Sequence, residues 1–342
     1  MKIKSLISML LGAISIASAT DSTRVLFIGN SFTGNNDMPG IFQKICKSKN
    51  KIVHVEKSWK GGASIKDQTL RPEVFSAIKK GNWDFVILQG WSKEFIQEQE
   101  YIDSVTIPYA SMIIDSIKIN NPCAKILFYE TWGYHENKLR SDSTCCMLNN
   151  IQLNYEQMSD TISKGYAYLN KVFSCPVVPV GSIWKVFRTK YPDINLYDTA
   201  DYYHPNKIGS YLSASTFYTC IFHESPEGAM TKSIDYETAL KIQKLCAQSL
   251  VPNLDNLGFN SNYVKLNTRT TNEGKFELKA KAFEQENAII TWNLGNGKSL
   301  KGTSIEYTYP KAGQYKVIVT VKSACGIRTY SQWVHFKVKK HN

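Results

Sequence analysis

The sequence of 342 residues has few cysteines and lacks the common metal and nucleotide signatures. Its eight cysteines are too few for a disulfide-stapled scaffold, so a hydrophobic core must hold the fold. No Cys-x-x-Cys pair occurs, which argues against a structural zinc site. No HExxH, P-loop or paired-carboxylate signature stands out, so metalloprotease, NTPase and glycosidase activities lack support. We therefore expect no metal and no cofactor.

Negative charge is also scarce, because 29 Asp and Glu residues stand against 41 Lys and Arg residues, a net charge of +12. Such a balance is compatible with anionic partners but carries no information about the fold. We predict no nucleic-acid partner, and the sequence does not set the oligomeric state. With 43% hydrophobic and 20% charged residues the composition is that of a globular protein, and the length predicts about two domains.

One apolar run suggests a targeting function, and it lies at the start of the chain. Lys2 and Lys4 precede an apolar stretch at 6–16, and the Ala-Ser-Ala sequence at 17–19 supplies the small residues that a signal peptidase cleaves. The run is too short to anchor the chain across a bilayer, and no cysteine follows it for a lipid anchor. We expect residues 1–19 to be a signal peptide. The mature protein is then exported to the periplasm, the cell surface or the medium, with no membrane span.

The cysteines are unevenly placed. Seven lie in the first 250 residues and Cys325 stands alone near the C-terminus. One of the seven therefore stays a free thiol unless the two regions are cross-linked. Adjacent Cys145 and Cys146 lie in a polar stretch, and we expect two surface-loop cysteines with separate fates. The sequence does not choose among the possible pairings.

From Arg24 to about Val251 the sequence alternates short apolar runs with helical stretches. The runs, which are apolar on both faces as strands buried between helix layers are, lie at 25–28, 52–55, 85–88, 126–129 and 176–180. Helical stretches between them include 39–48, 109–119 and 158–172. This alternation predicts an α/β domain with a parallel sheet and right-handed crossovers. Ligands bind such sheets at the carboxyl ends of the strands.

The pattern changes after Val251. Residues 252–261 are rich in Asn and contain Gly, which is typical of a linker. Beyond them the chain alternates with a period of two, as at 276–280 and 315–321, and turn residues separate the strands. We expect a signal peptide at 1–19, a catalytic domain at 20–251, a linker at 252–262 and a small β-sandwich at 263–342.

A serine follows the first predicted strand directly. Ser31 lies in Gly-Asn-Ser-Phe-Thr at 29–33, at the carboxyl end of that strand and ahead of a helix. A serine there is well placed as a nucleophile, with backbone N–H groups of the next turn near a developing oxyanion. The alternative is a residue that only caps a helix. After the second strand, Gly61 and Gly62 either bring the backbone close to a ligand or form a plain loop.

Asp201 and His204 lie three residues apart, before what we expect to be the final helix. In such a turn the carboxylate can accept a hydrogen bond from imidazole Nδ1, which leaves Nε2 free to take a proton from a serine. The alternative is a helix-capping Asp201 and a surface His204. The buried stripe of the helix is expected at Tyr211, Ala214, Tyr218 and Ile221.

Together these segments resemble the SGNH hydrolases, also called the GDSL-like esterase and lipase superfamily, over roughly residues 24–251. Ser31 is similar to the first block, Gly62 to the second, and Asp201 with His204 to the last, in the family's order. The resemblance implies a flavodoxin-like three-layer α/β/α sandwich with a parallel sheet. It also implies metal-free ester hydrolysis through an acyl-serine. Ser31 would be the nucleophile, His204 the base and Asp201 its partner, with the Ser31 and Gly62 N–H groups in the oxyanion hole.

The sequence departs from the family at its third block, where an asparagine usually donates a side-chain N–H to the oxyanion. The third predicted strand here ends in Leu-Gln-Gly-Trp-Ser-Lys at 88–93, without an asparagine. That stretch resembles the Gln-Gly-Glu-Ser-Asn segment of sialate O-acetylesterase-like members, on which Lys93 falls at the asparagine. We expect the Gln89 amide to be the third donor. The alternative is that Gln89 only ties neighbouring loops together.

Two tryptophans near the predicted strand ends are candidate substrate-binding residues. Trp91 follows the third strand and Trp132 the fourth, and both could stack on a sugar ring. Isolated aromatic residues are more often packing residues, so this is the minor hypothesis.

The C-terminal region resembles a PKD domain over about residues 264–339. The segments at 290–297 and 307–317 are similar to its two signatures. The resemblance implies an immunoglobulin-like β-sandwich in an exported protein, with Trp292 in its core.

We therefore predict an exported serine esterase that deacetylates carbohydrate, with an ester-bearing carbohydrate as its substrate. A lipid or aryl esterase is the enzymatic alternative, and it requires an apolar acyl groove. A non-catalytic glycan-binding protein on a hydrolase scaffold is the alternative of another class, because the third-block asparagine is missing.

Overall fold

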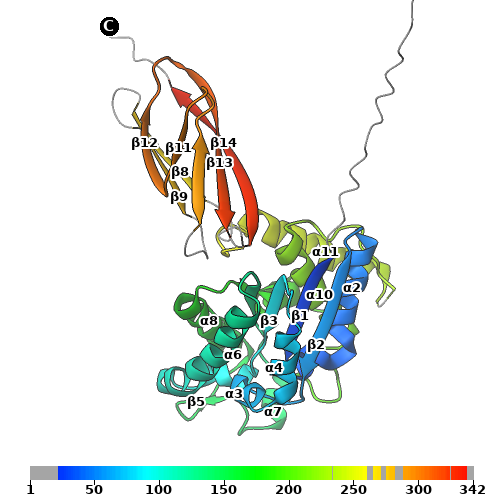
Figure 1. Ribbon diagram of the computed structural model, residues 1–342. Coiled ribbons are helices and arrows are strands. Elements are labelled where there is room, and N and C mark those ends of the chain that lie inside the picture. The colour runs from blue at the N-terminus through cyan, green and yellow to red at the C-terminus, as the bar shows by residue number, and fades with distance from the viewer. Residues whose placement is uncertain are drawn as a thin grey trace, which may run out of the picture.

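The computed structural model describes residues 22–232, 234–259, 265–270, 275–281, 288–323 and 325–336. The predicted signal peptide at 1–19 lies outside the described residues. Figure 1 shows an α/β domain followed by a β-sandwich. Among the described residues, no helix combines the length and the apolar character needed to cross a membrane.

A five-stranded parallel sheet forms the centre of the first domain, in the order β2-β1-β3-β4-β7. Its strands are β1 (Thr23–Gly29), β2 (Val53–Trp59), β3 (Phe85–Leu88), β4 (Lys125–Tyr129) and β7 (Val177–Val178). All five overlap the apolar runs of the sequence. The four residues Val25 to Ile28 of β1 are almost completely buried, because β1 is an inner strand covered on both faces.

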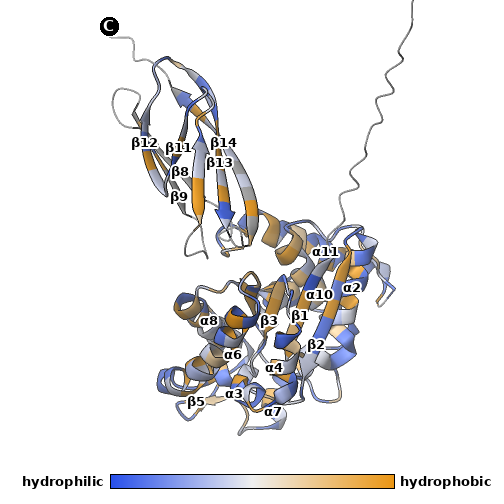
Figure 2. Ribbon diagram, in the orientation of Figure 1, coloured by the Kyte–Doolittle hydropathy of each residue, from blue (hydrophilic) through white to orange (hydrophobic). Residues whose placement is uncertain are grey.

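Helices cover both faces of this sheet, which confirms the three-layer prediction. Figure 1 shows α2 and α10 on one side and α4 and α6 on the other, and Figure 2 shows that the sheet between them is predominantly hydrophobic. The longer helices are α2 (Met38–Ser48), α4 (Pro72–Lys79), α6 (Ile107–Asn120), α8 (Tyr155–Phe173), α9 (Val180–Lys190), α10 (Lys207–Phe222) and α11 (Tyr236–Leu250). Shorter elements are α1 (Ser31–Gly34), η1 (Asn35–Asp37), α3 (Ile65–Thr69), η2 (Ser92–Ile96), α5 (Gln99–Tyr101), η3 (Ile102–Thr106), α7 (Glu136–Ser141), β5 (Met147–Leu148), β6 (Ile151–Gln152) and η4 (Val251–Asn253).

Helix α10, which follows the Asp201–His204 segment, is more buried than the sequence suggested. Every residue from Gly209 to Ile221 is buried, not only the predicted stripe. The helix packs against α2, α9 and α11 as well as the sheet strand β7, so it has no solvent face. It is also not the final helix, because α11 follows it.

The C-terminal region consists of two antiparallel sheets, β11-β10-β13-β14 and β12-β9-β8, as predicted for a β-sandwich. Their strands are β8 (Lys265–Thr270), β9 (Lys275–Lys281), β10 (Ile289–Asn293), β11 (Ser299–Lys301), β12 (Ser304–Thr308), β13 (Gly313–Ser323) and β14 (Gly326–Phe336). Trp292 is 1% exposed in a core with Tyr309 and Val319, and its indole N–H donates to the Gly302 carbonyl at 2.8 Å. Trp292 is therefore a core residue, as expected.

The segment predicted as a linker at 252–262 belongs partly to the first domain. Leu254 and Phe259 are each 3% exposed and pack into the core of the α/β domain. The first domain thus extends to Phe259, because these two apolar side chains pack in its core. The remainder of the predicted linker lies outside the described residues.

A disulfide joins Cys123 of the α/β domain to Cys325 of the sandwich, 202 residues later. The two regions are thus cross-linked, and the other six cysteines are buried and lie outside this disulfide. Cys145 and Cys146 are 1% and 2% exposed, so the expectation of two surface-loop cysteines is wrong. Their neighbours in the sequence are polar, but the two cysteines lie in a turn whose thiols pack against the core.

We predict that peptide mapping recovers this single cross-link. When the unreduced protein is alkylated in denaturant and digested, Cys123 and Cys325 should appear in one linked pair of peptides, because their Cα atoms lie 5.4 Å apart. The other six cysteines should carry the alkyl group. Alkylated Cys123 or Cys325 without prior reduction would contradict the pairing.

Candidate active site

Ser31 lies at the carboxyl end of β1, where the chain turns into the short helix α1. Asn30 caps this helix, because its side-chain oxygen accepts a hydrogen bond from the Phe32 N–H at 3.0 Å. The capping residue is thus Asn30, and Ser31 is the first helical residue. Its hydroxyl is consequently not used for capping and points to a partner elsewhere in the fold.

Asp201 and His204 lie in the loop before α10. The His204 Nδ1 atom lies 2.6 Å from Asp201 Oδ2, and His204 Nε2 lies 2.7 Å from Ser31 Oγ. The structure therefore brings together three predicted residues that span 173 positions of sequence. Serine, imidazole and carboxylate stand in the order of a catalytic triad.

The Asp201 carboxylate is held as an anion. Burial raises its pKa, but hydrogen bonds from the His204 ring and from the backbone N–H groups of Tyr203 and His204 outweigh burial, so the net pKa is below its usual value. Asp201 thus keeps one oxygen for the loop backbone and the other for His204 Nδ1. This arrangement fixes the tautomer in which His204 Nε2 faces Ser31.

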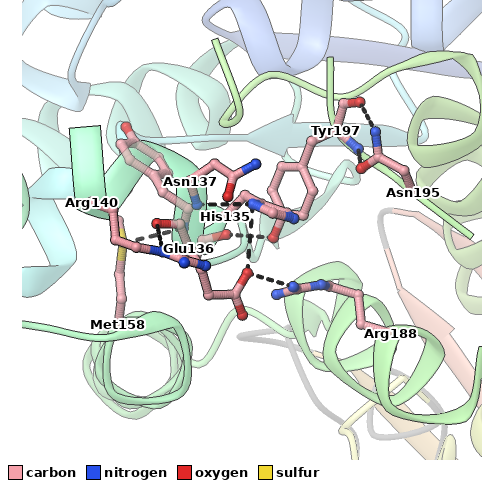
Figure 3. Close-up of polar contacts among 10 residues, drawn as sticks. His135, Glu136, Asn137, Arg140, Met158, Arg188, Asn195 and Tyr197 are labelled. Carbon is pink, nitrogen blue, oxygen red and sulfur yellow. Dashed lines mark hydrogen bonds and ion pairs between the residues drawn. The ribbon is translucent and has the colours of Figure 1, made fainter. Parts of the chain in front are cut away.

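A polar network behind the triad holds the loop in place. The His135 N–H donates to the Tyr202 carbonyl at 3.0 Å, and Tyr202 adopts a positive φ of 61°. Figure 3 shows His135 beside Glu136, whose carboxylate accepts from the Arg188 guanidinium at 2.7 Å. Through this network the start of α7 and helix α9 support the backbone on which Asp201 and His204 lie.

Gly62 faces the same site from the loop after β2. Its φ of +68° is a backbone conformation that favours glycine, and space around it is open. Within the described part of the chain, the N–H groups of Ser31 and Gly62 donate to no protein acceptor. Both residues line one cavity, so their N–H groups are available to an oxyanion.

The structure does not support the predicted role of Gln89 as third donor. Its amide nitrogen already donates to Asn30 Oδ1 at 2.8 Å and to the Gly90 carbonyl, and its oxygen accepts from the Asn30 N–H and the Thr33 hydroxyl. Gln89 is 1% exposed and does not line the cavity. The alternative holds instead, because Gln89 ties the loop after β3 to the turn that carries Ser31.

The cavity at the triad has a volume of about 410 Å³, within the range of small-molecule sites. It is lined by Asn30, Ser31, Phe32, Asn35, Gly61, Gly62, Trp91, Lys93, Tyr134, Lys138, Tyr203 and His204. No group of three or more His, Cys, Asp or Glu side chains that could hold a metal ion occurs in the described ranges.

The two candidate tryptophans have different positions. Trp91 lines the cavity and is 37% exposed, which leaves its ring accessible to a ligand. Trp132 is completely buried and stacks between Phe32 and Trp184, at 4.6 and 3.9 Å between ring centroids. The hypothesis that Trp132 binds substrate is wrong, because the residue is part of the core beneath the site.

Several lining residues were not among the predicted site residues. The sequence singled out Lys93 only as the residue at the position of the third-block asparagine. Tyr134 and Lys138 line the cavity but belong to no motif that the sequence analysis identified. They follow β4, so their place after a strand of the parallel sheet was the one available signal.

Glu94 joins two segments that line the cavity. Its carboxylate accepts hydrogen bonds from the Trp91 N–H at 2.7 Å and from the Ile65 N–H at 3.0 Å, and Ile65 follows the loop that carries Gly62. Burial raises the pKa of Glu94 to about 7, although these two hydrogen bonds lower it. The carboxylate thus fixes the distance between the glycine loop and the wall that bears Trp91.

Comparisons with known proteins identify the C-terminal region. Residues 260–334 match the family model of the PKD domain. This region is a PKD domain. A solved PKD1 domain of Epp from Vibrio anguillarum is 20% identical, and the match covers 22% of this chain and 94% of that one, with a TM-score of 0.21. The sandwich of β8 to β14 is therefore the PKD domain that the sequence predicted.

Comparison with solved structures also covers the α/β domain. A DUF4886 family protein from Bacteroides uniformis is 17% identical over 67% of this chain and 95% of that chain, with a TM-score of 0.57, and the two share a fold. An acetyl xylan esterase is 19% identical over 58% of this chain and 99% of that chain, with a TM-score of 0.42. A search of curated proteins found no match to this chain.

We predict that replacing Glu94 alters the pH dependence of stability. The carboxyl binds its proton more tightly in the folded state, so the contribution of Glu94 to stability falls as the pH rises from about 4.5 to about 7. In Glu94→Gln this loss is absent. The free energy of unfolding of the variant, relative to wild type, should rise by about 3 kcal/mol between pH 4.5 and 7.5, since a tenfold change in proton affinity is about 1.4 kcal/mol.

Urea denaturation at the two pH values measures this difference. Glu56→Gln is the matched control, because lysine and histidine partners lower the pKa of the half-buried Glu56 and its replacement should give no such rise. An equal difference between Glu94→Gln and wild type at both pH values would show that Glu94 is not held with a raised pKa.

Proposed function

We propose that the α/β domain hydrolyses carboxylic esters through an acyl-serine intermediate on Ser31. The observation that carries this proposal is the bridge made by His204, whose Nε2 lies 2.7 Å from Ser31 Oγ while its Nδ1 lies 2.6 Å from the Asp201 carboxylate. The three side chains meet at a cavity with two available backbone N–H groups.

The geometry translates into a two-step reaction. Ser31 Oγ attacks the ester carbonyl carbon while His204 Nε2 takes the serine proton, and the carbonyl oxygen becomes an oxyanion near the Ser31 and Gly62 N–H groups. When the carbon–oxygen bond to the alcohol breaks, His204 returns the proton to the leaving oxygen. A water molecule then attacks the acyl-serine with His204 as base, and the acid and free Ser31 are released. The Asp201 carboxylate orients His204 and stabilises its charged form.

Carbohydrate acetyl esters are the substrate class that the cavity favours. Polar and aromatic residues line it, and Trp91 offers an accessible ring of the kind that packs on sugars. A lipid esterase requires an apolar acyl groove, whereas the lining of this cavity combines aromatic side chains with lysine, asparagine, serine and histidine side chains. Action on external glycans further rests on export through the predicted signal peptide at 1–19.

We predict that Ser31→Ala abolishes acetate release from acetylated glycans and from a small aryl acetate. The rate should fall by about 10⁴-fold or more, because the nucleophile is lost while the fold remains. Ser64→Ala is the matched control, since Ser64 caps α3 in the loop after β2 and takes no part in the triad. Equal turnover by wild type and Ser31→Ala would refute the nucleophile. Glycan binding without turnover of any ester by wild type would favour the non-catalytic alternative.

Asp201→Asn should lower kcat by about 10⁴-fold, because an amide in place of the carboxylate favours the wrong histidine tautomer. Asp198→Asn serves as the control, since among the described residues the only hydrogen bond to the Asp198 side chain comes from the Ala200 N–H in the same loop. Stopped-flow or steady-state kinetics with the aryl acetate measures both. Equal losses in the two variants would assign Asp201 a role in loop structure alone.

A further inference from the structure

The cavity at the triad has a positively charged wall. Lys93 on η2 and Lys138 on α7 both line it, whereas its lining includes no Asp or Glu residue. The Lys93 ammonium lies 5.5 Å from the centroid of the Trp91 ring, and that of Lys138 lies 6.0 Å from the centroid of the Tyr203 ring. Both charges therefore lie beside aromatic surfaces on which a ligand ring would rest.

The two lysines differ in how far the protein neutralises them. Lys138 forms an ion pair with Asp142 at 3.2 Å, one turn further along. Lys93 has no carboxylate within ion-pair distance in the described ranges. A half-buried ammonium with no protein counter-charge, at the mouth of a cavity of about 410 Å³, is available to an anion.

The two lysines also affect the nearby thiol of Cys145. A hydrogen bond with Cys146 lowers the pKa of Cys145 against the effect of burial. Lys93 and Lys138 also lower this pKa, whereas Asp142 raises it.

We infer that this cavity selects ester substrates that carry a negative charge on the alcohol part, a carboxylate or a sulfate on the acetylated sugar. Lys93 contacts the anionic group, Lys138 adds to the field, and Trp91 packs against the ring. The inference rests on the proposed esterase function and narrows its substrate class. Lys93 thus takes a specificity role at the position where the resemblance to SGNH hydrolases implies an oxyanion asparagine.

The test compares kcat/KM for matched acetates that differ only in charge. Acetylated methyl galacturonoside, acetylated methyl galactoside and its sulfated counterpart form the sugar series, and 4-acetoxybenzoate with 4-methylphenyl acetate forms an aryl pair. Wild type should prefer the charged member by at least about tenfold, and added salt should reduce this preference. The two anionic sugars show whether a carboxylate or a sulfate is preferred.

Lys93→Met should lower the charged-to-neutral ratio of kcat/KM by at least about tenfold, mainly through KM, and Lys93→Glu should lower it further. Lys118→Met is the matched control, because Lys118 is an exposed lysine on α6 outside the cavity, and its ratio should equal that of wild type. An unchanged ratio in both Lys93 variants, or no preference in wild type for either pair, would overturn the inference. An equal loss of kcat on charged and neutral esters would also overturn it, because that result assigns Lys93 to the oxyanion.

The same assays separate this inference from the proposed function. Ser31-dependent hydrolysis of the aryl acetates without any preference for charge leaves the esterase in place and removes the anionic subsite. Absence of Ser31-dependent hydrolysis from every ester removes both.

Discussion

The hydrogen bond between His204 Nε2 and Ser31 Oγ joins two segments of the α/β domain that lie far apart in the sequence. Ser31 follows the first strand, and His204 lies in the loop before α10. The contact at 2.7 Å requires β1, the α1 cap and the loop of 198–204 to hold their positions together. Much of the buried polar structure of the domain serves these positions, since Gln89 holds the Ser31 turn and the His135 network holds the His204 loop.

Buried carboxylates are a second feature of the domain. Glu94 and Glu130 are almost completely buried, and burial raises the pKa of each to about 7. Each accepts hydrogen bonds, Glu94 from two backbone N–H groups and Glu130 from the Ser182 hydroxyl. Buried charge of this kind costs stability, so its presence close to the strand ends fits a site in which loop geometry matters more than maximal stability.

Much of the fold followed from local sequence patterns. The apolar runs identified all five strands of the main sheet, because strands buried on both faces are continuously hydrophobic. Ser31, Asp201 and His204 were found through their places after a strand and before a helix. The role of Gln89 was not predicted correctly. The sequence around a glutamine does not show whether its amide is buried and hydrogen-bonded to neighbours or faces a cavity. Trp132 was misassigned because its place after a strand does not show whether its ring is exposed or buried. The predicted linker at 252–262 contains two core residues, Leu254 and Phe259.

The proposed oxyanion hole has two available backbone donors, at Ser31 and Gly62, and no side-chain amide where the sequence suggested one. Removal of one donor costs about 100- to 1,000-fold in rate in a serine hydrolase, so we expect a slow enzyme. Lys93 stands near the position of the missing amide with an unneutralised charge. Its proposed role in substrate choice fits a site that gains affinity from the charge of its substrate.

Covalent labelling tests the central claim most directly. A fluorophosphonate reacts with a serine only when a base activates the hydroxyl, so the probe should form one adduct per chain of wild-type protein. We predict that this adduct maps to the tryptic peptide 25–44, in which Ser31 is the one serine, and that His204→Ala prevents it. An adduct on another serine, or no adduct on folded wild-type protein, would contradict an activated nucleophile at Ser31.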